Sequence, residues 1–193
     1  MARFFKHIMV VAIVVAWGAV GWVLSADRTA ASEPGDQPRR VVSLTPDVTE
    51  LLFALGLGEK VVGVSTFCDY PPEATTRPKV GTYWEPDIEA IIACRPDLIA
   101  GEDSSKSDVL RRLGRIGYRT ASLRLNTIAE LLAAIDAIAG MTRRTAEAET
   151  LKNSMATRLG TVSAAVRDRP RPRVLWVIQA QPLRVAGRDT FIN

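Results

Sequence analysis

Short apolar runs alternate with helix-period apolar stripes through the middle of the chain. The short runs predict four strands, at Arg40–Leu44, Val61–Ser65, Leu98–Ala100 and Arg119–Leu123. Between and after them, apolar residues recur at spacings of three and four, which is typical of amphipathic helices, over residues 48–55, 88–94, 109–113 and 131–138. Because strands separated by helices pair in parallel, the pattern predicts an α/β fold with a small parallel sheet flanked by helices.

Capping residues mark where these helices begin. Thr45 is expected to cap the first helix, with Pro46 at its first position, and Asp87 is expected to cap the second. Thr127 and Glu130 have the spacing of a capping box before the last stripe. The capping residues therefore define the helix starts more closely than the apolar stripes alone.

The first 39 residues have a different pattern. Arg3 and Lys6 precede a charge-free apolar run at residues 8–24, so residues 1–26 are interpreted as a signal peptide or an N-terminal anchor. Residues 27–39 have no apolar periodicity and are predicted to be a disordered tether. Positive charge before the apolar run orients the rest of the chain away from the cytoplasm, so an exported, periplasmic location is expected, with anchoring to the inner membrane as one alternative.

A long helix and an apolar strand come after the α/β pattern. The segment Thr145–Val166 reads as one Ala-rich, largely polar helix of about 33 Å at 1.5 Å per residue. The run Val174–Ile178 predicts a buried strand without partners, so the sequence is expected to end early.

The stretch from Val61 to Pro72 is the main candidate for a ligand site. A buried strand ends there in Phe67, Asp69 and Tyr70, and two prolines then stop any pairing. Ligands of open α/β sheets bind beyond the carboxyl ends of the strands. The alternative is that the aromatic residues only pack beneath a loop.

Composition excludes several other functions. The one histidine is His7, so neither a His-based metal site nor a Ser-His or Cys-His catalytic pair is expected, and the protein is predicted to be no enzyme and to need no cofactor. The net charge is +4, but the only arginine cluster, at residues 167–173, is interleaved with prolines and reads as a linker. Nucleic-acid binding is therefore not expected.

The two cysteines are Cys68 and Cys94. Outside the cytoplasm, a single pair of cysteines makes a disulfide possible, although Cys94 ends its helix away from the carboxyl edge of the sheet, where Cys68 is expected. The alternatives are a buried free thiol at Cys94 and a Cys68 that lines a pocket.

Several motifs together resemble the periplasmic substrate-binding proteins of the cobalamin and iron-siderophore type, which serve ABC importers. The resemblance covers residues 39–193 and is carried by Val41–Pro46 with Thr49–Leu52, Gly63–Ser65 with Cys68–Pro72, Val80–Gly81, and Ile88–Ile91 with Arg95–Ile99. It implies two α/β lobes joined by one long helix, with the ligand held between them. On that basis residues 40–142 would be the first lobe, residues 143–168 the linking helix and residues 169–193 the start of a truncated second lobe.

The resemblance also implies a function. The protein would capture cobalamin or a related corrinoid and present it to an ABC permease. Binding of an iron-siderophore or haem is an alternative within the same class. An inactive membrane-anchored fragment or an interaction module is an alternative from another class.

Carried over by position, the resemblance implies most of the ligand-binding residues. Phe67 and Tyr83 fall where cobalamin-binding relatives have ligand-facing aromatic residues, and Trp84 is adjacent; flat aromatic faces suit such ligands. Glu102 departs from the pattern, which has tryptophan there, and would suit a cationic or hydroxyl-rich ligand. Asp69 and Tyr70 come after the second strand, while Ser43 and Thr45 lie at the mouth of the first and could donate hydrogen bonds.

One further residue is implied to contact a partner. Glu89 matches a surface glutamate that pairs with arginines of the permease in this family. The alternative is an ordinary solvated residue on a helix.

Overall fold

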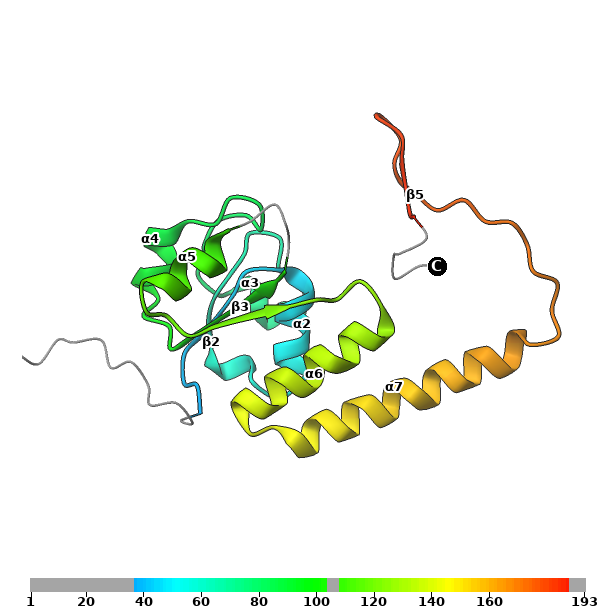
Figure 1. Ribbon diagram of the computed structural model, residues 1–193, viewed down its shortest axis with the longest axis horizontal. Helices are drawn as coiled ribbons and strands as arrows, with labels where there is room; N and C mark the ends of the chain where they lie inside the picture. The colour runs from blue at the N-terminus through cyan, green and yellow to red at the C-terminus, as the bar shows by residue number, and fades with distance from the viewer. Residues whose placement is uncertain (1–36, 104–107, 188–193) are drawn as a thin grey trace, which may run out of the picture. The chain divides into compact units, whose positions relative to one another are not determined.

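A computed structural model of the chain describes residues 37–103 and 108–187. Its central feature is a four-stranded, fully parallel sheet in the order β2-β1-β3-β4 (Figure 1). The strands are β1 (Val41–Ser43), β2 (Val61–Val64), β3 (Leu98–Glu102) and β4 (Thr120–Leu123). The predicted α/β fold is therefore confirmed.

Helices connect the strands and complete the fold. The α-helices are α2 (Pro46–Ala54), α3 (Pro72–Thr75), α4 (Ile88–Ala93), α5 (Val109–Arg115), α6 (Ile128–Thr142) and α7 (Thr145–Val166), with a 3₁₀ turn at Gly58–Lys60. The four-residue α3 and the 3₁₀ turn are too short to produce a periodic apolar stripe, and no sequence pattern predicted them. Among the described residues, no helix has both the length and the apolar character needed to cross a membrane. The predicted signal peptide or anchor at residues 1–26 lies outside the described residues.

Two of the three predicted helix caps are confirmed. The Asp87 carboxylate accepts from the Ala90 N–H at 3.0 Å. Thr127 Oγ1 accepts from the Glu130 N–H at 3.1 Å, and the Glu130 carboxylate in return accepts from the N–H of Asn126.

The third predicted cap, at Thr45, is wrong in its chemistry. Thr45 occupies the N-cap position of α2 and Pro46 the first helical position, but the Thr45 hydroxyl makes no capping bond. The Asp47 carboxylate instead accepts from the N–H of Val48 at 2.8 Å. A carboxylate within the first turn of the helix thus satisfies a free N–H group at the helix start.

Both faces of the sheet are covered, as a parallel sheet requires. Helices α2 and α6 lie on one side of the sheet and α4 and α5 on the other (Figure 1). Alternate residues of β1 point to opposite faces, so Val41 belongs to the apolar cluster that includes α2 and α6 residues, and Val42 to the cluster that includes α4 and α5 residues. On the second face, a Cβ at Gly63 would come within 2.9 Å of Cys94 Sγ. A glycine in β2 therefore lets the end of α4 lie directly on the sheet.

The possible disulfide between Cys68 and Cys94 does not form, and both residues are free thiols. Cys68 packs in the cluster with Val41, whereas Cys94 packs in the opposite cluster with Val42. The sheet therefore separates the two sulfur atoms. Cys68 is the fully buried thiol and does not line a surface pocket, while Cys94 is only half-buried.

Helix α7 has the bounds that the sequence predicted. Its first turns pack on α6 through the buried Ala148, and Lys152 Nζ donates to Asp136 at 2.7 Å. Farther along, the same apolar stripe continues through Leu159, Val162 and Val166, which are 44%, 60% and 55% exposed. Only the first part of α7 therefore has tertiary support among the described residues.

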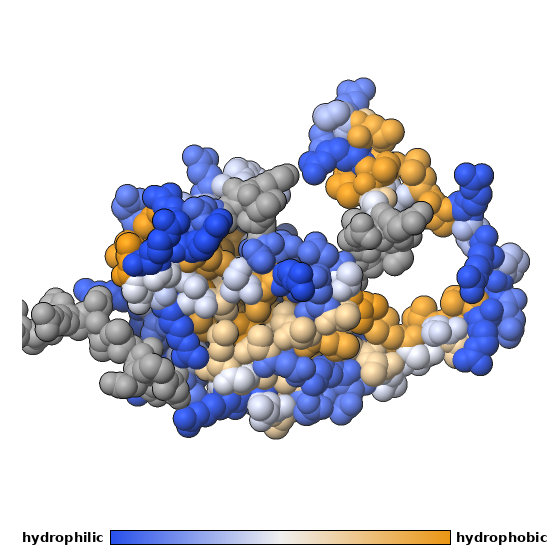
Figure 2. Space-filling view, in the orientation of Figure 1, coloured by the Kyte–Doolittle hydropathy of each residue, from blue (hydrophilic) through white to orange (hydrophobic). Residues whose placement is uncertain are grey.

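The strand predicted at Val174–Ile178 is wrong in its bounds. An antiparallel hairpin forms instead from β5 (Val177–Gln179) and β6 (Arg184–Val185). Residues 174–176 lie outside β5, whose partner β6 is only two residues long. The hairpin and the residues directly before it expose apolar side chains (Figure 2), including Leu183 at 66% and Trp176 at 55%.

Candidate ligand-binding site

The carboxyl ends of β1, β2 and β3 lie at one edge of the sheet, because the strands are parallel. The loops after these three strands carry most of the side chains that the sequence singled out as ligand-binding. This edge is the position at which open α/β sheets bind ligands. We refer to it as the rim.

Three aromatic side chains gather on the rim. The ring centroid of Trp84 lies 5.1 Å from that of Phe67 and 4.4 Å from that of Tyr83, and the Phe67 and Tyr83 centroids are 6.4 Å apart. The three residues are 47%, 46% and 50% exposed for Phe67, Tyr83 and Trp84. We call this group the aromatic platform.

A tight turn holds Tyr83 and Trp84 in the platform. Residues Gly81 and Pro86 form an isolated antiparallel bridge, and the Thr82 N–H donates to the Glu85 carbonyl at 3.1 Å. The Thr82 hydroxyl in turn accepts from the Glu85 N–H at 3.0 Å. Tyr83 and Trp84 are the two residues at the tip of this turn.

Gly81 is essential to the turn. Its φ is +87°, and a Cβ there would lie 2.6 Å from the Asp87 nitrogen and 2.7 Å from the Glu85 oxygen. The loop after β2 is attached at the same point, since both the N–H and the hydroxyl of Thr66 donate to the Gly81 carbonyl, at 2.8 and 3.0 Å. The Thr66–Gly81 contacts thus bring Phe67 to Tyr83 and Trp84.

Tyr70 does not join the platform. It is 62% exposed and lines a groove of about 640 Å³ along α2, together with Glu50, Phe53 and Arg77. The predicted ligand-binding residues of the β2 loop therefore divide between two neighbouring surfaces.

Ser43 and Thr45 lie beneath the rim rather than on it. Ser43 is fully buried; its hydroxyl donates to the Thr45 carbonyl at 3.2 Å and lies 2.8 Å from Thr49 Oγ1. Thr45 is 7% exposed, and its Oγ1 has no hydrogen-bond partner among the described residues. Neither hydroxyl is accessible at the surface in this structure.

Carboxylates occupy the rest of the rim. Burial raises the pKa of the half-buried Glu102, and the nearby Asp47 and Asp103 raise it further. Burial likewise raises the pKa of Glu50, with additional contributions from Asp47 and Asp69. These electrostatic contacts connect five residues, which we call the rim carboxylates: Asp47, Glu50, Asp69, Glu102 and Asp103.

Sequence reasoning identified Asp69 and Glu102 but missed Asp47 and Glu50 as site residues. Their spacing of three residues in the first turns of α2 places both on one side of that helix. This spacing, directly after a strand end, was the available signal. Across residues 37–103 and 108–187, no cluster of His, Cys, Asp or Glu side chains has an arrangement that could hold a metal ion.

Glu89 is in the first turn of α4 and is not one of the rim carboxylates. Its side chain is exposed. Glu89 is therefore accessible to a partner protein, and it is equally compatible with an ordinary solvated helix residue.

Comparisons with known proteins agree with the fold. Residues 41–193 match the family described as "Periplasmic binding protein". The chain is 30% identical over 165 residues to an uncharacterised ABC transporter substrate-binding lipoprotein, YvrC of Bacillus subtilis, covering 81% of this chain. It is 31% identical over 160 residues to a vitamin B12-binding protein of Pectobacterium atrosepticum, covering 80%.

Two solved structures are similar as well. The periplasmic vitamin B12-binding protein BtuF of Vibrio cholerae superposes with a TM-score of 0.72 at 25% identity, over 79% of this chain and 60% of that one. A periplasmic haem-binding protein of Pseudomonas aeruginosa gives 0.68 at 30% identity, over 78% and 57%. The chain spans 52% and 57% of the lengths of the two curated relatives, so just over half of each is represented here.

Proposed function

Because this chain belongs to the periplasmic binding protein family, we propose that it acts outside the cytoplasm as the substrate-binding component of an ABC importer. Relatives named as an ABC transporter substrate-binding lipoprotein and as vitamin B12-binding proteins support this role. Such a component captures its ligand and releases it unchanged, so we propose no catalytic function.

The ligand that we propose is cobalamin or a related corrinoid, and the aromatic platform is the observation that carries the proposal. Its three rings are about half exposed although they are large and apolar. Contiguous exposed apolar side chains mark interaction sites on soluble proteins. A flat macrocycle can cover such rings at little cost in side-chain entropy.

Haem is the second candidate ligand, with an iron-siderophore in the same class. The similar haem-binding structure from Pseudomonas aeruginosa favours it, and an aromatic platform can stack on either macrocycle. A third alternative, an inactive fragment or an interaction module, is distinguished by the absence of binding to any of these ligands.

Equilibrium dialysis of the full chain against cobalamin, with visible absorbance as the readout, tests the proposal. We expect saturable retention of cobalamin that falls about tenfold in affinity in Phe67→Ala or Trp84→Ala, a loss of about 1.4 kcal/mol. Trp176→Ala is the matched control, since Trp176 is similarly exposed at 55% but lies directly before β5, far along the chain from the platform residues.

Three outcomes separate the candidates. Retention of cobalamin that depends on Trp84 and not on Trp176 supports the corrinoid proposal. Retention of haem without cobalamin would replace it with the second candidate. Failure to retain either molecule, or the same loss in both tryptophan variants, would refute a ligand site at the platform.

Glu89 is our proposed contact for the permease. A single exposed charge affects the rate and orientation of docking more than the final affinity. Glu89→Lys is therefore expected to slow association of the chain with lipid vesicles that contain the permease, while leaving cobalamin retention unchanged.

A further inference from the structure

We propose that the rim selects its ligand by charge, accepting a flat macrocycle whose edge carries cationic or hydrogen-bond-donating groups and rejecting one whose edge carries carboxylates. This inference rests on the proposed function, since it concerns the chemical class of ligand that the same site would take. It goes beyond the aromatic platform, because aromatic rings alone would accept both kinds of macrocycle.

The order of the strands spreads negative charge along the whole rim. Asp69 comes after β2, Asp47 comes after β1 and Glu102 ends β3, and these strands are neighbours in that order in the sheet. Glu50 lies one helical turn beyond Asp47, and Asp103 is adjacent to Glu102. A ligand that stacks on the platform and extends across the rim would therefore pass over carboxylates from three separate elements.

The carboxylates interact with one another rather than with basic partners. The electrostatic contacts of Glu50 reach Asp47 and Asp69, and those of Glu102 reach Asp47 and Asp103. Over residues 37–103 and 108–187, no ion pair connects a lysine or arginine to any of the five. Within the described residues the rim carboxylates therefore have no ion-pair partner, and a cationic ligand would supply one.

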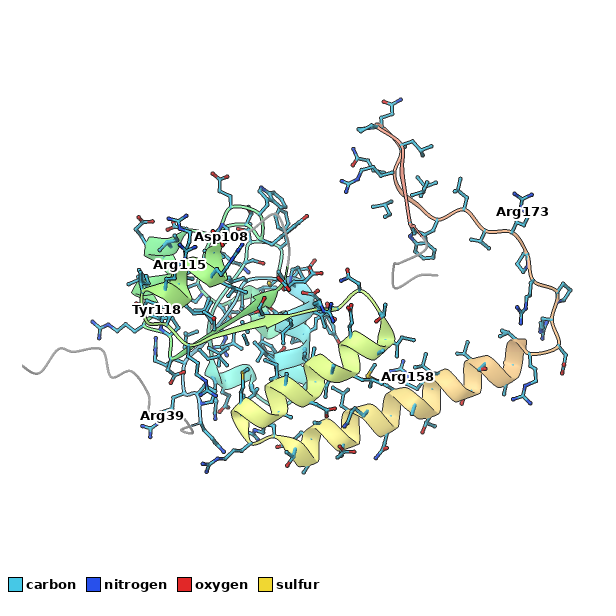
Figure 3. All side chains as sticks on the ribbon, in the orientation of Figure 1. Arg39, Asp108, Arg115, Tyr118, Arg158 and Arg173 are labelled. Atoms are coloured by element: carbon cyan, nitrogen blue, oxygen red, sulfur yellow. The ribbon has the colours of Figure 1, made fainter. Side chains whose placement is uncertain are left out.

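Three described basic residues near the same loops already have other partners. Lys79 Nζ donates to the carbonyl of Cys68 at 3.2 Å, and Arg124 pairs with Glu130 at 3.3 Å. On α5, Arg115 pairs with Asp108 at 3.5 Å (Figure 3). A macrocycle with carboxylate groups would meet five negative side chains and would have to break existing contacts to reach Lys79, Arg115 or Arg124.

The arrangement favours an extended organic cation over a metal ion. A metal ion needs several ligands converging on one point, and the described residues include no such cluster. Separate carboxylates along a rim instead match charges or amide donors placed around a wide ring.

A pair of porphyrins with the same ring and opposite edge charge tests the inference with the full chain. The cationic probe is tetrakis(N-methylpyridinium-4-yl)porphyrin and the anionic probe is tetrakis(4-carboxyphenyl)porphyrin, each titrated by its absorbance at neutral pH. The net charge of the chain is +4, so non-specific attraction would favour the anionic probe. A preference for the cationic probe would therefore have to come from the local site.

We expect the cationic porphyrin to bind at least tenfold more tightly, and we expect this preference to shrink in 0.5 M salt, where charges are screened. Glu102→Gln and Asp47→Asn should each reduce the preference several-fold. The amide oxygen introduced by Asp47→Asn could still accept from the Val48 N–H, so the helix start is preserved. Asp168→Asn removes the same charge from an exposed residue after α7 and should leave the preference unchanged.

The outcomes separate failure of the inference from failure of the proposed function. Cobalamin retention together with equal or tighter binding of the anionic porphyrin would overturn charge selection and leave the proposed function standing. An identical effect of Glu102→Gln and Asp168→Asn would also overturn it, by attributing the preference to net charge. Loss of all binding, to cobalamin and both porphyrins, would refute the proposed function and the inference with it.

Discussion

Substituting Gly81 by alanine should displace the aromatic platform. It should also cost more stability than the same substitution at a glycine turn whose surroundings leave room for a Cβ. Two costs arise at this position. Placing a residue with a Cβ at a φ of +87° costs about 1–2 kcal/mol. The new Cβ would also lie 2.6 Å from the Asp87 nitrogen and 2.7 Å from the Glu85 oxygen, and overpacking of this kind costs about 1–3 kcal/mol.

Gly117 provides a matched control for the first of these costs. Its φ is +99°, but no atom lies within 4 Å of the position that its Cβ would occupy. Gly117→Ala should therefore cost only the conformational part, about 1–2 kcal/mol. The difference between the two variants measures the steric conflict inside the turn.

Thermal unfolding and cobalamin retention are the two measurements. For a chain of this size, each 1 kcal/mol lowers the melting temperature by about 2–4 °C. Gly117→Ala should lower it by the smaller amount and retain cobalamin normally. Gly81→Ala should either lower it further or open the turn locally, and in both cases cobalamin retention should fall because Tyr83 and Trp84 are displaced.

The reasoning about the turn has a clear point of failure. The neighbours of the added methyl group are backbone atoms of Glu85 and Asp87, which cannot rotate away as a side chain could. If Gly81→Ala matched Gly117→Ala in both melting temperature and cobalamin retention, the steric argument would be refuted. The platform would then not depend on the geometry of this turn.

Local contacts give three further predictions. Thiol labelling followed by mass spectrometry should detect two reactive thiols per unfolded chain without prior reduction. In the folded protein, Cys94 should react before the fully buried Cys68. Glu102→Gln should raise the melting temperature at pH 7. Burial and neighbouring carboxylates raise the pKa of Glu102 in the folded state, so above that pKa the negative charge of Glu102 opposes folding. The gain in melting temperature should therefore shrink as the pH falls through the folded-state pKa of Glu102. Thr127→Ala should cost about 1 kcal/mol in urea unfolding through loss of its cap, and an unchanged midpoint would contradict the role of the 3.1 Å bond to the Glu130 N–H.

Sequence reasoning succeeded for elements with local signals. The bounds of α7 and the caps at Asp87 and Thr127 depend on residues within a few positions of one another, so they can be recognised without knowledge of the fold. Phe67 was identified because a strand end and two prolines mark the start of a loop, whereas Tyr83 and Trp84 were identified only from the resemblance to cobalamin-binding relatives.

The failures all involve contacts between distant segments or the geometry of a single turn. Whether Cys68 and Cys94 face each other depends on which side of the sheet each element packs, and no local pattern specifies that. Asp47 and Glu50 joined the site only once the order β2-β1-β3 placed them between Asp69 and Glu102. Residue type alone suggested Thr45 as the cap. That the Val48 N–H donates to the Asp47 carboxylate instead depends on the local geometry of the turn, which residue type does not specify.

The unequal support along α7 divides this helix into two parts with different stability. Up to Met155, the apolar stripe is packed against the lobe, and beyond it Leu159, Val162 and Val166 face solvent. Helical segments of this length are marginal in water unless they extend from an existing helix. The docked turns therefore serve as the nucleus for the rest, and fraying should begin at the distal end and stop near residue 155.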